Sequence, residues 1–362
     1  MLVFINGRFA SQELTGVQRS AVELLRALDQ RLGDARAGAP LHLFRLLTPA
    51  GASRLPELHH IPVRRVGKHS GHLWEQLELP LYARGGLLLS LGNAGPLAKR
   101  KQIVTIHDAS VFVVPETYSP AFRLWYQLLL PLLGRTVLRV VTVSQFSRSE
   151  LARHAKIPVT KVAVIPNGAE HILNAAADVR ILEKVGVIPG RFILAVGSQS
   201  PHKNFQLVGQ GFERLARNDL HLVVAGGQNR RIFEPTSGAG LAGAKMVGYV
   251  TDGELRALYE TAACFVFPSR YEGFGLPPLE AMACGCPVVV SRGGALEEVC
   301  GNAALYCDPD DPDTLVECIR RILDESGLSA RLKSEGRARA AEFTWHRAAT
   351  ALLRLVDEAA SR

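Results

Sequence analysis

The stretch from Tyr271 to Gly285 places two acidic residues, Glu272 and Glu280, on either side of a glycine-rich turn. The apolar run over 264–269 that precedes it predicts a buried strand, and the sequence over 279–284 predicts a helix. Glycines in such a turn let the backbone come close to a ligand, and the free N–H groups at a helix start attract an anion. Glu272 on the loop and Glu280 in the first helical turn are then able to contact two parts of one ligand. This combination favours a site for an anionic, hydroxyl-rich molecule.

A simpler interpretation of the two acids stays open at this stage. Glu280 is a residue that stabilises the positive end of a helix without any ligand, and Glu272 is then a solvated loop residue. Pro277 and Pro278 fit both interpretations, because proline prefers the first turn of a helix.

Lys203 is a candidate for a phosphate-binding residue. It lies in the segment Ala195–Asn204, which follows a predicted strand over 192–197 and precedes a predicted helix. Open α/β sheets bind ligands beside the carboxyl ends of their strands, so the lysine is expected at this edge of a sheet. The alternative is a solvated loop lysine.

His107 and Asp108 also follow a predicted strand, which covers 102–107. A histidine at this place is available to a ligand at the carboxyl edge of the sheet, although a lone histidine is more often structural. Asp108 is expected either to orient the imidazole ring or to cap the segment that follows.

The run Tyr-Glu-Gly-Phe-Gly-Leu-Pro at 271–277, with Glu-Ala-Met-Ala-Cys-Gly at 280–285, resembles the E-x7-E signature of GT-B glycosyltransferases, specifically family 4. The resemblance covers nearly the whole chain. It implies a retaining transferase that binds a nucleotide-diphosphate sugar in a cleft between two domains and needs no cofactor and no metal. It also implies that Glu272 holds a sugar hydroxyl, that Glu280 holds the ribose, and that His107 lies beside the reacting sugar.

The resemblance further implies a set of donor-binding residues. They are Gly16, Ser198, His202, Lys203, Val250, Gly273, Phe274, Gly275, Leu276 and Glu280. Lys203, the backbone of 273–276 and the glycine loop at Gly16 are expected to bind the diphosphate, and the segment 245–252 matches the one whose backbone meets the nucleobase. Two positions depart from the family pattern. Gln18 replaces a frequent glycine, and Ser198 replaces a frequent arginine, for which His202 is the candidate substitute.

The substrates are specified less sharply. The run Pro-His-Lys-Asn at 201–204 and the segment Trp74–Pro80 resemble members that add mannose or a related deoxyhexose to surface polysaccharides. A GDP-sugar is therefore the first expectation and a UDP-sugar the second. Two other classes stay open: a nucleotide-sugar epimerase or NAD-dependent enzyme, and a non-catalytic nucleotide-sugar-binding subunit. The lack of a dinucleotide fingerprint after the strand 2–6 argues against the enzymes of the first class.

Two further motifs are given structural interpretations. Asp308–Asp313 contains D-x-D twice, but Asp313 is expected to be the N-cap of a helix over 314–323, so no metal site is predicted. The G-x-G-x-x-G match at 238–243 is not preceded by a strand, as a dinucleotide fingerprint requires.

Charge is distributed unevenly over the 362 residues. Residues 1–170 contain 21 Lys and Arg against 11 Asp and Glu, whereas the remainder contains 21 against 23. A basic first half favours an acidic substrate or an anionic membrane surface. No basic run interleaved with aromatic residues is present, so nucleic acid is not expected as a partner.

The apolar runs are too short to span a bilayer, and the first residues lack the pattern of a signal peptide. A cytoplasmic protein, in peripheral contact with the inner face of the membrane, is expected. The six cysteines lie in the second half without a Cys-x2-Cys spacing, which predicts buried thiols rather than disulfides or zinc ligands.

Apolar strands and helical stretches alternate along the whole chain, which is typical of α/β proteins with parallel sheets. The expected strands cover 2–6, 41–47, 61–66, 86–91, 102–107, 139–144, 162–166, 192–197, 221–226, 245–250, 264–268, 287–291 and 304–307. The predicted domains are an acceptor-binding Rossmann-like domain over 1–170 and a nucleotide-sugar-binding one over 171–345. The resemblance implies that a terminal helix over 346–362 packs back on the first domain.

The acceptor is expected to be a glycan or a polyprenyl-diphosphate-linked glycan. The segment Pro120–Leu130 combines aromatic, apolar and basic residues. It is consistent with a helix on a membrane surface and, alternatively, with a core helix, which is the preferred interpretation.

Overall fold

The computed structural model describes residues 1–34, 42–198, 200–227, 241 and 243–361. The chain divides into two compact units. The first unit contains Met1–Phe112, Leu124–Gly168 and Trp345–Arg362, and the second contains Val113–Arg123 and Ala169–Thr344. Each is described below by itself.

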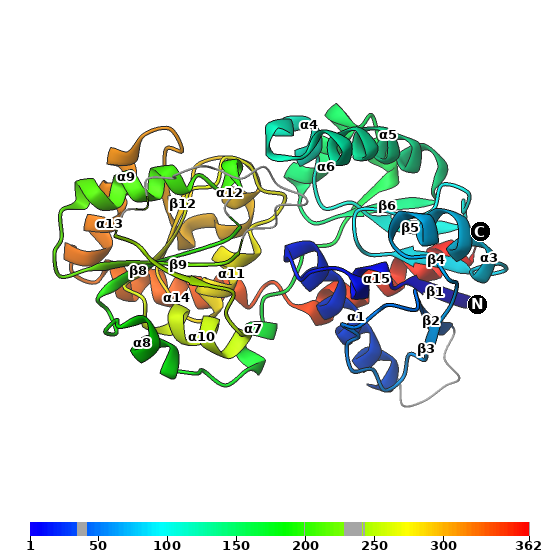
Figure 1. Ribbon diagram of the computed structural model, residues 1–362, viewed down its shortest axis with the longest axis horizontal. Coiled ribbons are helices and arrows are strands. Elements are labelled where there is room, and N and C mark those ends of the chain that lie inside the picture. Colours follow the sequence, from blue (N-terminus) through cyan, green and yellow to red (C-terminus); the bar gives the residue numbers. More distant parts are fainter. Residues whose placement is uncertain (35–41, 199, 228–240, 242, 362) are drawn as a thin grey trace. The chain divides into compact units, whose positions relative to one another are not determined.

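The first unit is built on a parallel sheet with the strand order β3-β2-β1-β4-β5-β6-β7 (Figure 1). Its strands are β1 (Leu2–Asn6), β2 (Leu43–Thr48), β3 (Val63–Arg65), β4 (Leu87–Ser90), β5 (Gln102–Thr105), β6 (Arg139–Thr142) and β7 (Val162–Val164). The central strands are continuous apolar runs that are buried on both faces, as expected of a parallel sheet covered by helices.

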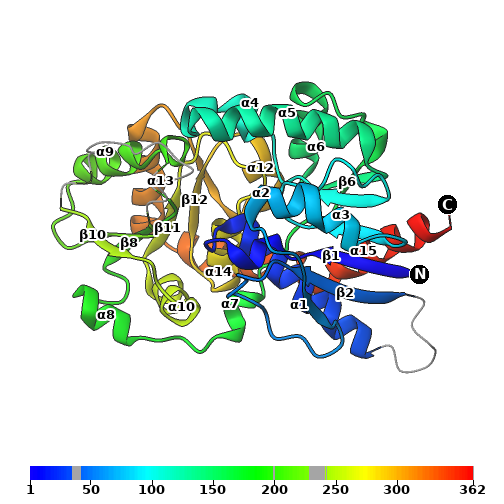
Figure 2. The same ribbon diagram turned by 45° about the vertical axis from the view of Figure 1, so that its right-hand side comes forward.

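The helices of this unit include α15, the last helix of the chain. Its helical segments are η1 (Arg8–Ser11), α1 (Gly16–Asp34), α2 (Gly71–Leu73), η2 (Trp74–Glu78), α3 (Leu79–Tyr82), α4 (Ser110–Val113), α5 (Pro120–Thr136), α6 (Gln145–His154), η4 (Val159–Lys161) and α15 (Trp345–Ala360). The helix α15 packs against α1, and both views show the two side by side (Figures 1 and 2). The expected return of the terminal helix to the first domain is confirmed.

The second unit has its own parallel sheet with the strand order β10-β9-β8-β11-β12-β13. The strands are β8 (Phe192–Val196), β9 (His221–Ala225), β10 (Lys245–Gly248), β11 (Cys264–Phe267), β12 (Val288–Ser291) and β13 (Leu305–Cys307). The helical segments are η3 (Pro115–Thr117), α7 (His171–Asn174), α8 (Arg180–Val185), η5 (Pro201–Lys203), α9 (Phe205–Leu215), α10 (Asp252–Thr261), α11 (Leu276–Ala283), α12 (Gly294–Cys300), η6 (Gly301–Ala303), α13 (Pro312–Asp324) and α14 (Leu328–Ala340). α9 packs on α13 and α11 on α14, so that helices bury the sheet between them.

Both sheets reverse the order of their strands at one place. In the first unit, β2 and β3 extend the sheet to one side of β1, and β4 resumes it on the other side. In the second unit, β9 and β10 lie to one side of β8, and β11 lies on the other. Such a switch point opens a crevice beside the carboxyl ends of the two central strands, where ligands bind in open α/β sheets.

Every strand expected from the sequence is present, but several helix ends differ from expectation. α11 begins at Leu276 rather than Leu279, and α13 begins at Pro312 rather than Thr314. The N-cap of α13 is Asp311, whose carboxylate accepts a hydrogen bond from the Asp313 N–H, so the prediction of Asp313 as the cap is wrong. The proline at 312 occupies the first helical position and sets the cap one residue before it.

The cysteine prediction is confirmed, because all six are buried and none forms a disulfide. Burial raises the pKa of Cys264 to about 12, so that its thiol stays protonated near neutral pH. Within the described part of the chain, no helix is both long and apolar enough to cross a membrane. Of the G-x-G-x-x-G match at 238–243, only Leu241 and Gly243 lie within the described residues.

Candidate functional site

The second unit places Lys203 and Glu272 together at the switch point of its sheet. Lys203 follows β8 and Glu272 follows β11, the two strands on either side of the reversal. The Lys203 ammonium donates a hydrogen bond of 2.6 Å to Glu272 Oε1, and the two side chains are 17% and 13% exposed. The same ammonium lies 4.9 Å from the centre of the Phe267 ring. A partly buried cation and a carboxylate therefore meet where a ligand is expected.

Asn204 fixes the loop that presents Lys203. Its backbone adopts a left-handed conformation with φ of 58°, which asparagine tolerates better than most residues. Its side-chain amide donates to the carbonyl oxygens of Pro268, at 3.1 Å, and Pro309, at 2.7 Å. These bonds join the loop after β8 to the loop after β11. No pattern in the sequence indicated this role of Asn204.

The glycine turn before α11 requires glycine at position 275. Gly275 has a φ of +98°, and a Cβ atom there would lie 2.5 Å from Leu296 Cδ2. Phe274 is buried, with its ring 5.8 Å from the ring of Phe343 in an edge-on arrangement. Gly273 to Leu276 therefore offer their backbone rather than exposed side chains to a ligand.

The N-terminus of α11 has fewer free donors than an ordinary helix start. Pro277 and Pro278 have no N–H, and the Leu279 N–H donates to the Gly275 carbonyl oxygen. Within the first turn of α11, only the N–H of Leu276 is left to meet an anion. The helix end as a whole therefore has few donors for an anion, and the binding of a diphosphate by the backbone of 273–276 stays a prediction.

Glu280 lies one turn further into α11 than predicted and is buried. Since the helix begins at Leu276, Glu280 is its fifth residue and not part of the first turn. His171 Nε2 lies 3.0 Å from Glu280 Oε1, and the Tyr259 hydroxyl donates to Glu280 Oε2 at 3.2 Å. Burial, together with the Glu280 charge, raises the pKa of Tyr259 well above its ordinary value, so that the phenol stays protonated and donates. Each carboxylate oxygen still has a second lone pair for a ligand hydroxyl.

Ser198 and His202 do not supply a second cation in this structure. The Ser198 hydroxyl lies 2.8 Å from the Ser200 hydroxyl, and the two share a hydrogen bond. His202 is buried, and burial together with the neighbouring Lys203 charge holds the pKa of its imidazole well below the ordinary value. The ring is therefore neutral near pH 7 in this structure, and the substitution of His202 for the frequent arginine stays a prediction. A neutral imidazole is still able to donate one hydrogen bond.

Val250 precedes the start of α10 and is half-buried. The next residue, Thr251, caps α10 in a reciprocal arrangement with Glu254, which fixes the backbone at this end of β10. On the neighbouring strand, Gly226 has a φ of +123°, and a Cβ atom there would lie 2.1 Å from the Gly197 carbonyl oxygen. The loops after β8 and β9 thus approach each other closely.

In the first unit, His107 is buried two residues beyond the end of β5. Its backbone N–H donates to Asn93 Oδ1 at 2.8 Å, and its ring Nε2 lies 3.4 Å from the Leu91 carbonyl oxygen. Burial lowers the pKa of the ring, so His107 is neutral near pH 7. Asp108 accepts a hydrogen bond from the Ser110 N–H at 2.8 Å, which shows that it caps the following segment.

Gly16 is the first residue of α1, after the loop that follows β1 and η1. No atom lies within 4 Å of the place where its Cβ would stand, so the backbone there is open. Thr15 hydrogen-bonds Gln18 through its hydroxyl, and its carbonyl oxygen accepts from the Arg19 N–H. The helix start is thus formed by local contacts.

The aspartates of the D-x-D segment have structural partners. Asp310 pairs with Arg270, Asp313 pairs with Arg214 at 2.8 Å, and Asp308 accepts from the Asp310 N–H. Over the described residues, no group of three His, Cys, Asp or Glu side chains is arranged to hold a metal ion. The expectation that the reaction needs no metal stays a prediction.

His171 and Tyr259, which hold Glu280, were not among the candidate residues from the sequence. His171 is 109 positions from Glu280 in the chain, and no local pattern connects the two. A buried carboxylate needs hydrogen-bond partners, so their existence, but not their identity, follows from the sequence.

This chain has two doubly wound sheets, with a cation–carboxylate pair at the switch point of the second. Two such sheets are the architecture of the GT-B class of glycosyltransferases. The Anabaena protein HepE in complex with UDP-glucose superposes with a TM-score of 0.77 over 99% of this chain and 100% of that one, at 16% identity. Residues 182–339 match the family model described as glycosyl transferases group 1, and residues 14–171 match the one described as Glycosyltransferase Family 4.

Relatives of known name agree with these matches. O-antigen chain mannosyltransferase B of Escherichia coli is 30% identical over 93% of this chain and 94% of its own. O-antigen chain mannosyltransferase RfbU of Salmonella typhimurium is 30% identical over 62% of this chain and 61% of its own. The chain belongs to glycosyltransferase family 4.

Proposed function

We propose that this glycosyltransferase moves a hexose, with retention of configuration, from a nucleotide-diphosphate sugar to a glycan or lipid-linked glycan during the synthesis of a surface polysaccharide. The observation that supports this proposal most directly is the Lys203–Glu272 pair at the switch point of the second sheet. It combines a cation for a diphosphate with a carboxylate for a hydroxyl at the edge where such sheets bind ligands.

Lys203 is proposed to stabilise the leaving diphosphate. As the glycosidic bond breaks, negative charge grows on the phosphate oxygen, and a cation already in place lowers the barrier without moving. A unit charge about 4 Å away contributes roughly 4 kcal/mol at an effective dielectric of 20. The amides of Gly273 to Leu276 add hydrogen bonds to the same oxygens, and the Gly16 loop is proposed to approach the phosphates as well.

Three other residues are proposed to position the donor. Glu272 accepts a hydrogen bond from a hydroxyl of the transferred sugar, and Glu280 uses its remaining lone pairs for the ribose. His107 is proposed to lie beside the reacting sugar as a neutral imidazole, because burial lowers its pKa. The backbone near Val250 is proposed to meet the nucleobase.

Mannose from a GDP-linked donor is the proposed sugar. Support comes from the names of the relatives, O-antigen chain mannosyltransferases that are each 30% identical. A UDP-sugar is the second choice, because the solved relative with UDP-glucose shares the fold. We propose no cofactor and no metal, and we assign the stabilisation of the leaving diphosphate to Lys203 and to hydrogen bonds from the loop amides.

The test is a thermal-shift panel of GDP, UDP, ADP and their sugars, followed by hydrolysis of the best donor. Stabilisation by one nucleotide and its sugar is expected, and hydrolysis is expected to survive EDTA. No shift with any nucleotide contradicts the proposal, and loss of activity in EDTA with recovery in Mn²⁺ contradicts the metal-free mechanism. Reduction of a nicotinamide, seen as a change in absorbance, would favour an epimerase or dehydrogenase. Nucleotide binding without hydrolysis or transfer would favour a binding subunit.

We also propose that the first unit contacts an anionic membrane. Leu73, Leu77 and Leu81 are exposed at intervals of four residues along α2 to α3, and Leu124, Leu128 and Leu132 repeat this spacing along α5. The other face of α5 is buried, so this helix has both a core face and an exposed apolar face. The excess of positive charge in residues 1–170 suits acidic lipids.

Flotation with vesicles tests this contact. The protein is expected to float with phosphatidylglycerol-containing vesicles more than with phosphatidylcholine vesicles, and Leu77→Ser with Leu128→Ser is expected to reduce flotation. Val179→Ser with Ile188→Ser, two exposed apolar residues of the second unit, is the matched control. Equal loss in both double variants contradicts a specific membrane face.

A further inference from the structure

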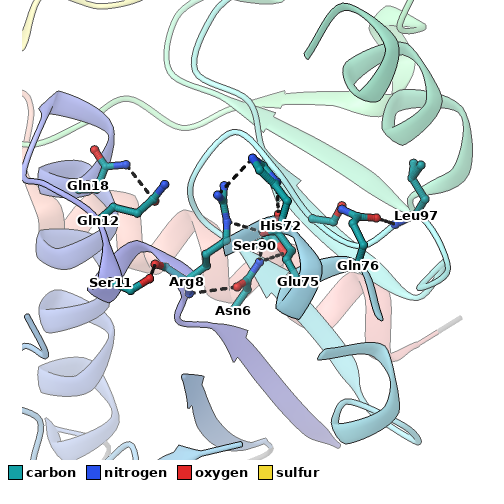
Figure 3. Close-up of polar contacts among 11 residues, drawn as sticks. Asn6, Arg8, Ser11, Gln12, Gln18, His72, Glu75, Gln76, Ser90 and Leu97 are labelled. Carbon is teal, nitrogen blue, oxygen red and sulfur yellow. Dashed lines mark hydrogen bonds and ion pairs between the residues drawn. The ribbon is translucent and has the colours of Figure 1, made fainter. Parts of the chain in front are cut away.

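A second ion pair, between Arg8 and Glu75, lies at the switch point of the first sheet and has no part in the proposed donor chemistry (Figure 3). Asn6 ends β1 and Ser90 ends β4, the two strands on either side of the reversal. The Asn6 amide donates to Glu75 Oε1 at 2.7 Å and to the Ser90 hydroxyl at 3.2 Å. The pair therefore occupies the place where this sheet is expected to bind a ligand.

The pair is almost completely buried. Arg8 Nε lies 3.0 Å from Glu75 Oε1, and the side chains are 6% and 1% exposed. Burial alone would raise the pKa of Glu75, but the Arg8 charge and hydrogen bonds from His72 and Asn6 outweigh it and hold this pKa below its usual value. Both groups are thus charged at neutral pH. Burying two charges rarely adds stability compared with apolar side chains, so stability gives little reason for this pair.

His72 connects the buried pair to the surface. Its Nδ1 lies 3.3 Å from Glu75 Oε2, and its Nε2 lies 3.5 Å from an Arg8 guanidinium nitrogen, yet its side chain is 36% exposed. Since the guanidinium only donates, Nε2 is assigned as an acceptor and the ring proton is assigned to Nδ1, facing Glu75. The Glu75 carboxylate, 3.3 Å from Nδ1, favours this orientation and this tautomer of the ring through its charge.

The contact between Arg8 and His72 offers a donor and an acceptor to one hydroxyl group beside it. At 3.5 Å, their contact is at the long limit of a hydrogen bond. A hydroxyl is able to accept from the Arg8 guanidinium and to donate to His72 Nε2 at the same time, whereas a fully ionised phosphate only accepts and an ammonium group only donates. The two protein groups thus present one donor and one acceptor side by side.

An aromatic surface adjoins this donor–acceptor pair. The indole of Trp125 lies with its ring centre 5.1 Å from that of His72, and it is partly exposed. The ring of Tyr126 lies 5.9 Å from His72 on the buried side. Aromatic faces pack well against the C–H groups of a sugar, while nearby polar groups select its hydroxyls.

We infer that Arg8, His72 and Trp125 form a subsite for a sugar of the acceptor, and that Glu75 and Asn6 are positioning residues for it. Arg8 and His72 bind one hydroxyl, and Trp125 packs against the ring that bears it. This inference rests on the proposed function, because only a glycosyltransferase with a glycan acceptor needs a second sugar site on the other sheet.

Saturation-transfer NMR with methyl α-D-mannopyranoside and with an α-mannobiose tests the subsite in the full chain, in the presence of the best nucleoside diphosphate. Wild-type protein is expected to transfer saturation to at least one of the two sugars. His72→Ala and Trp125→Ala are expected to weaken the apparent affinity roughly tenfold, the order of one lost hydrogen bond or packing contact. Tyr82→Ala, an exposed aromatic residue of the same unit, is the matched control.

The result is separable from the donor proposal. Both variants are expected to keep the wild-type thermal shift with the nucleotide and the wild-type rate of donor hydrolysis, while KM for the acceptor rises in transfer assays. Glu75→Gln is expected to raise the same KM with little change in donor hydrolysis, which a role in folding alone would not produce. No signal with wild-type protein from either sugar, or equal signals in wild type and both variants, overturns the inference. Loss of the nucleotide shift in wild type would instead refute the donor site.

Discussion

The Lys203–Glu272 pair leads to a prediction about how each of the two charges affects the binding of a nucleoside diphosphate and of the nucleotide sugar. At 2.6 Å, the carboxylate offsets much of the lysine's attraction for an anion. A phosphate about 4 Å from Lys203 gains roughly 4 kcal/mol, whereas repulsion from a carboxylate about 6 Å away costs roughly 3 kcal/mol at the same effective dielectric of 20. The net gain for a nucleoside diphosphate alone is then about 1 kcal/mol.

Two variants separate these contributions. Lys203→Ala is expected to slow donor hydrolysis by about 100- to 1000-fold, because up to roughly 4 kcal/mol of leaving-group stabilisation is lost. Glu272→Gln is expected to tighten the binding of the nucleoside diphosphate by at most about thirtyfold, because the repulsion is removed and water screens part of it. The same variant is expected to lose the additional affinity that the sugar of the intact donor provides.

The assay is calorimetric titration of wild type and both variants with the nucleoside diphosphate and with its sugar, together with a hydrolysis rate. Lys184→Ala, an exposed lysine on α8, is the control. Unchanged hydrolysis in Lys203→Ala refutes the assignment of the diphosphate cation. If Glu272→Gln weakens the binding of the nucleoside diphosphate and of the nucleotide sugar equally, Glu272 has no role at the sugar and only holds the Lys203 side chain.

Three further predictions concern stability. His202 has a lowered pKa because it is buried and lies near Lys203, so the unfolded chain binds the proton more readily than the folded protein. The free energy of unfolding is therefore expected to decrease as the pH is lowered below about 6.5. His202→Gln is expected to reduce this pH dependence in urea titrations at pH 5, 6 and 7. An unchanged slope would place the acid sensitivity elsewhere. Tyr259→Phe removes a buried hydrogen bond to Glu280 and is expected to cost about 1–3 kcal/mol in the same titration at pH 7, whereas an unchanged midpoint would show that Glu280 finds another donor. Gly275→Ala is expected to lower stability by at least about 1–3 kcal/mol because of its φ and the contact with Leu296, with Gly51→Ala, where a Cβ meets no neighbour, as the control; equal midpoints would contradict this reasoning.

Most strands were predictable because their sequences are short apolar runs, and a parallel sheet covered on both faces requires such runs. Helix starts were less predictable. At α11, the prolines signal a first turn without showing at which residue it begins, and the true start at Leu276 moved Glu280 out of that turn. The prediction that the terminal helix packs on the first unit came from the family resemblance, since periodicity alone does not say which unit a helix joins.

The side chains that hold the site were the least predictable. Glu75 was part of a recognised segment, but its partner Arg8 is 67 positions away and was not connected with it. The low pKa of His202 likewise depends on burial and on the nearby lysine, which are properties of the folded loop. Spacing identified Lys203 and Glu272 separately, and only the strand order brought them to one place.

The return of α15 to the first unit has a consequence for how this protein is made. Leu352 and Val356 of α15 are buried, and the helix covers α1, near the beginning of the chain. On the ribosome, residues 1–168 emerge long before Trp345–Ala360, so the first unit must wait through the synthesis of the whole second unit with part of its apolar surface uncovered. The second unit, by contrast, contains only residues that precede Trp345. Domains generally fold as units during synthesis, and here the unit that begins first is expected to finish last.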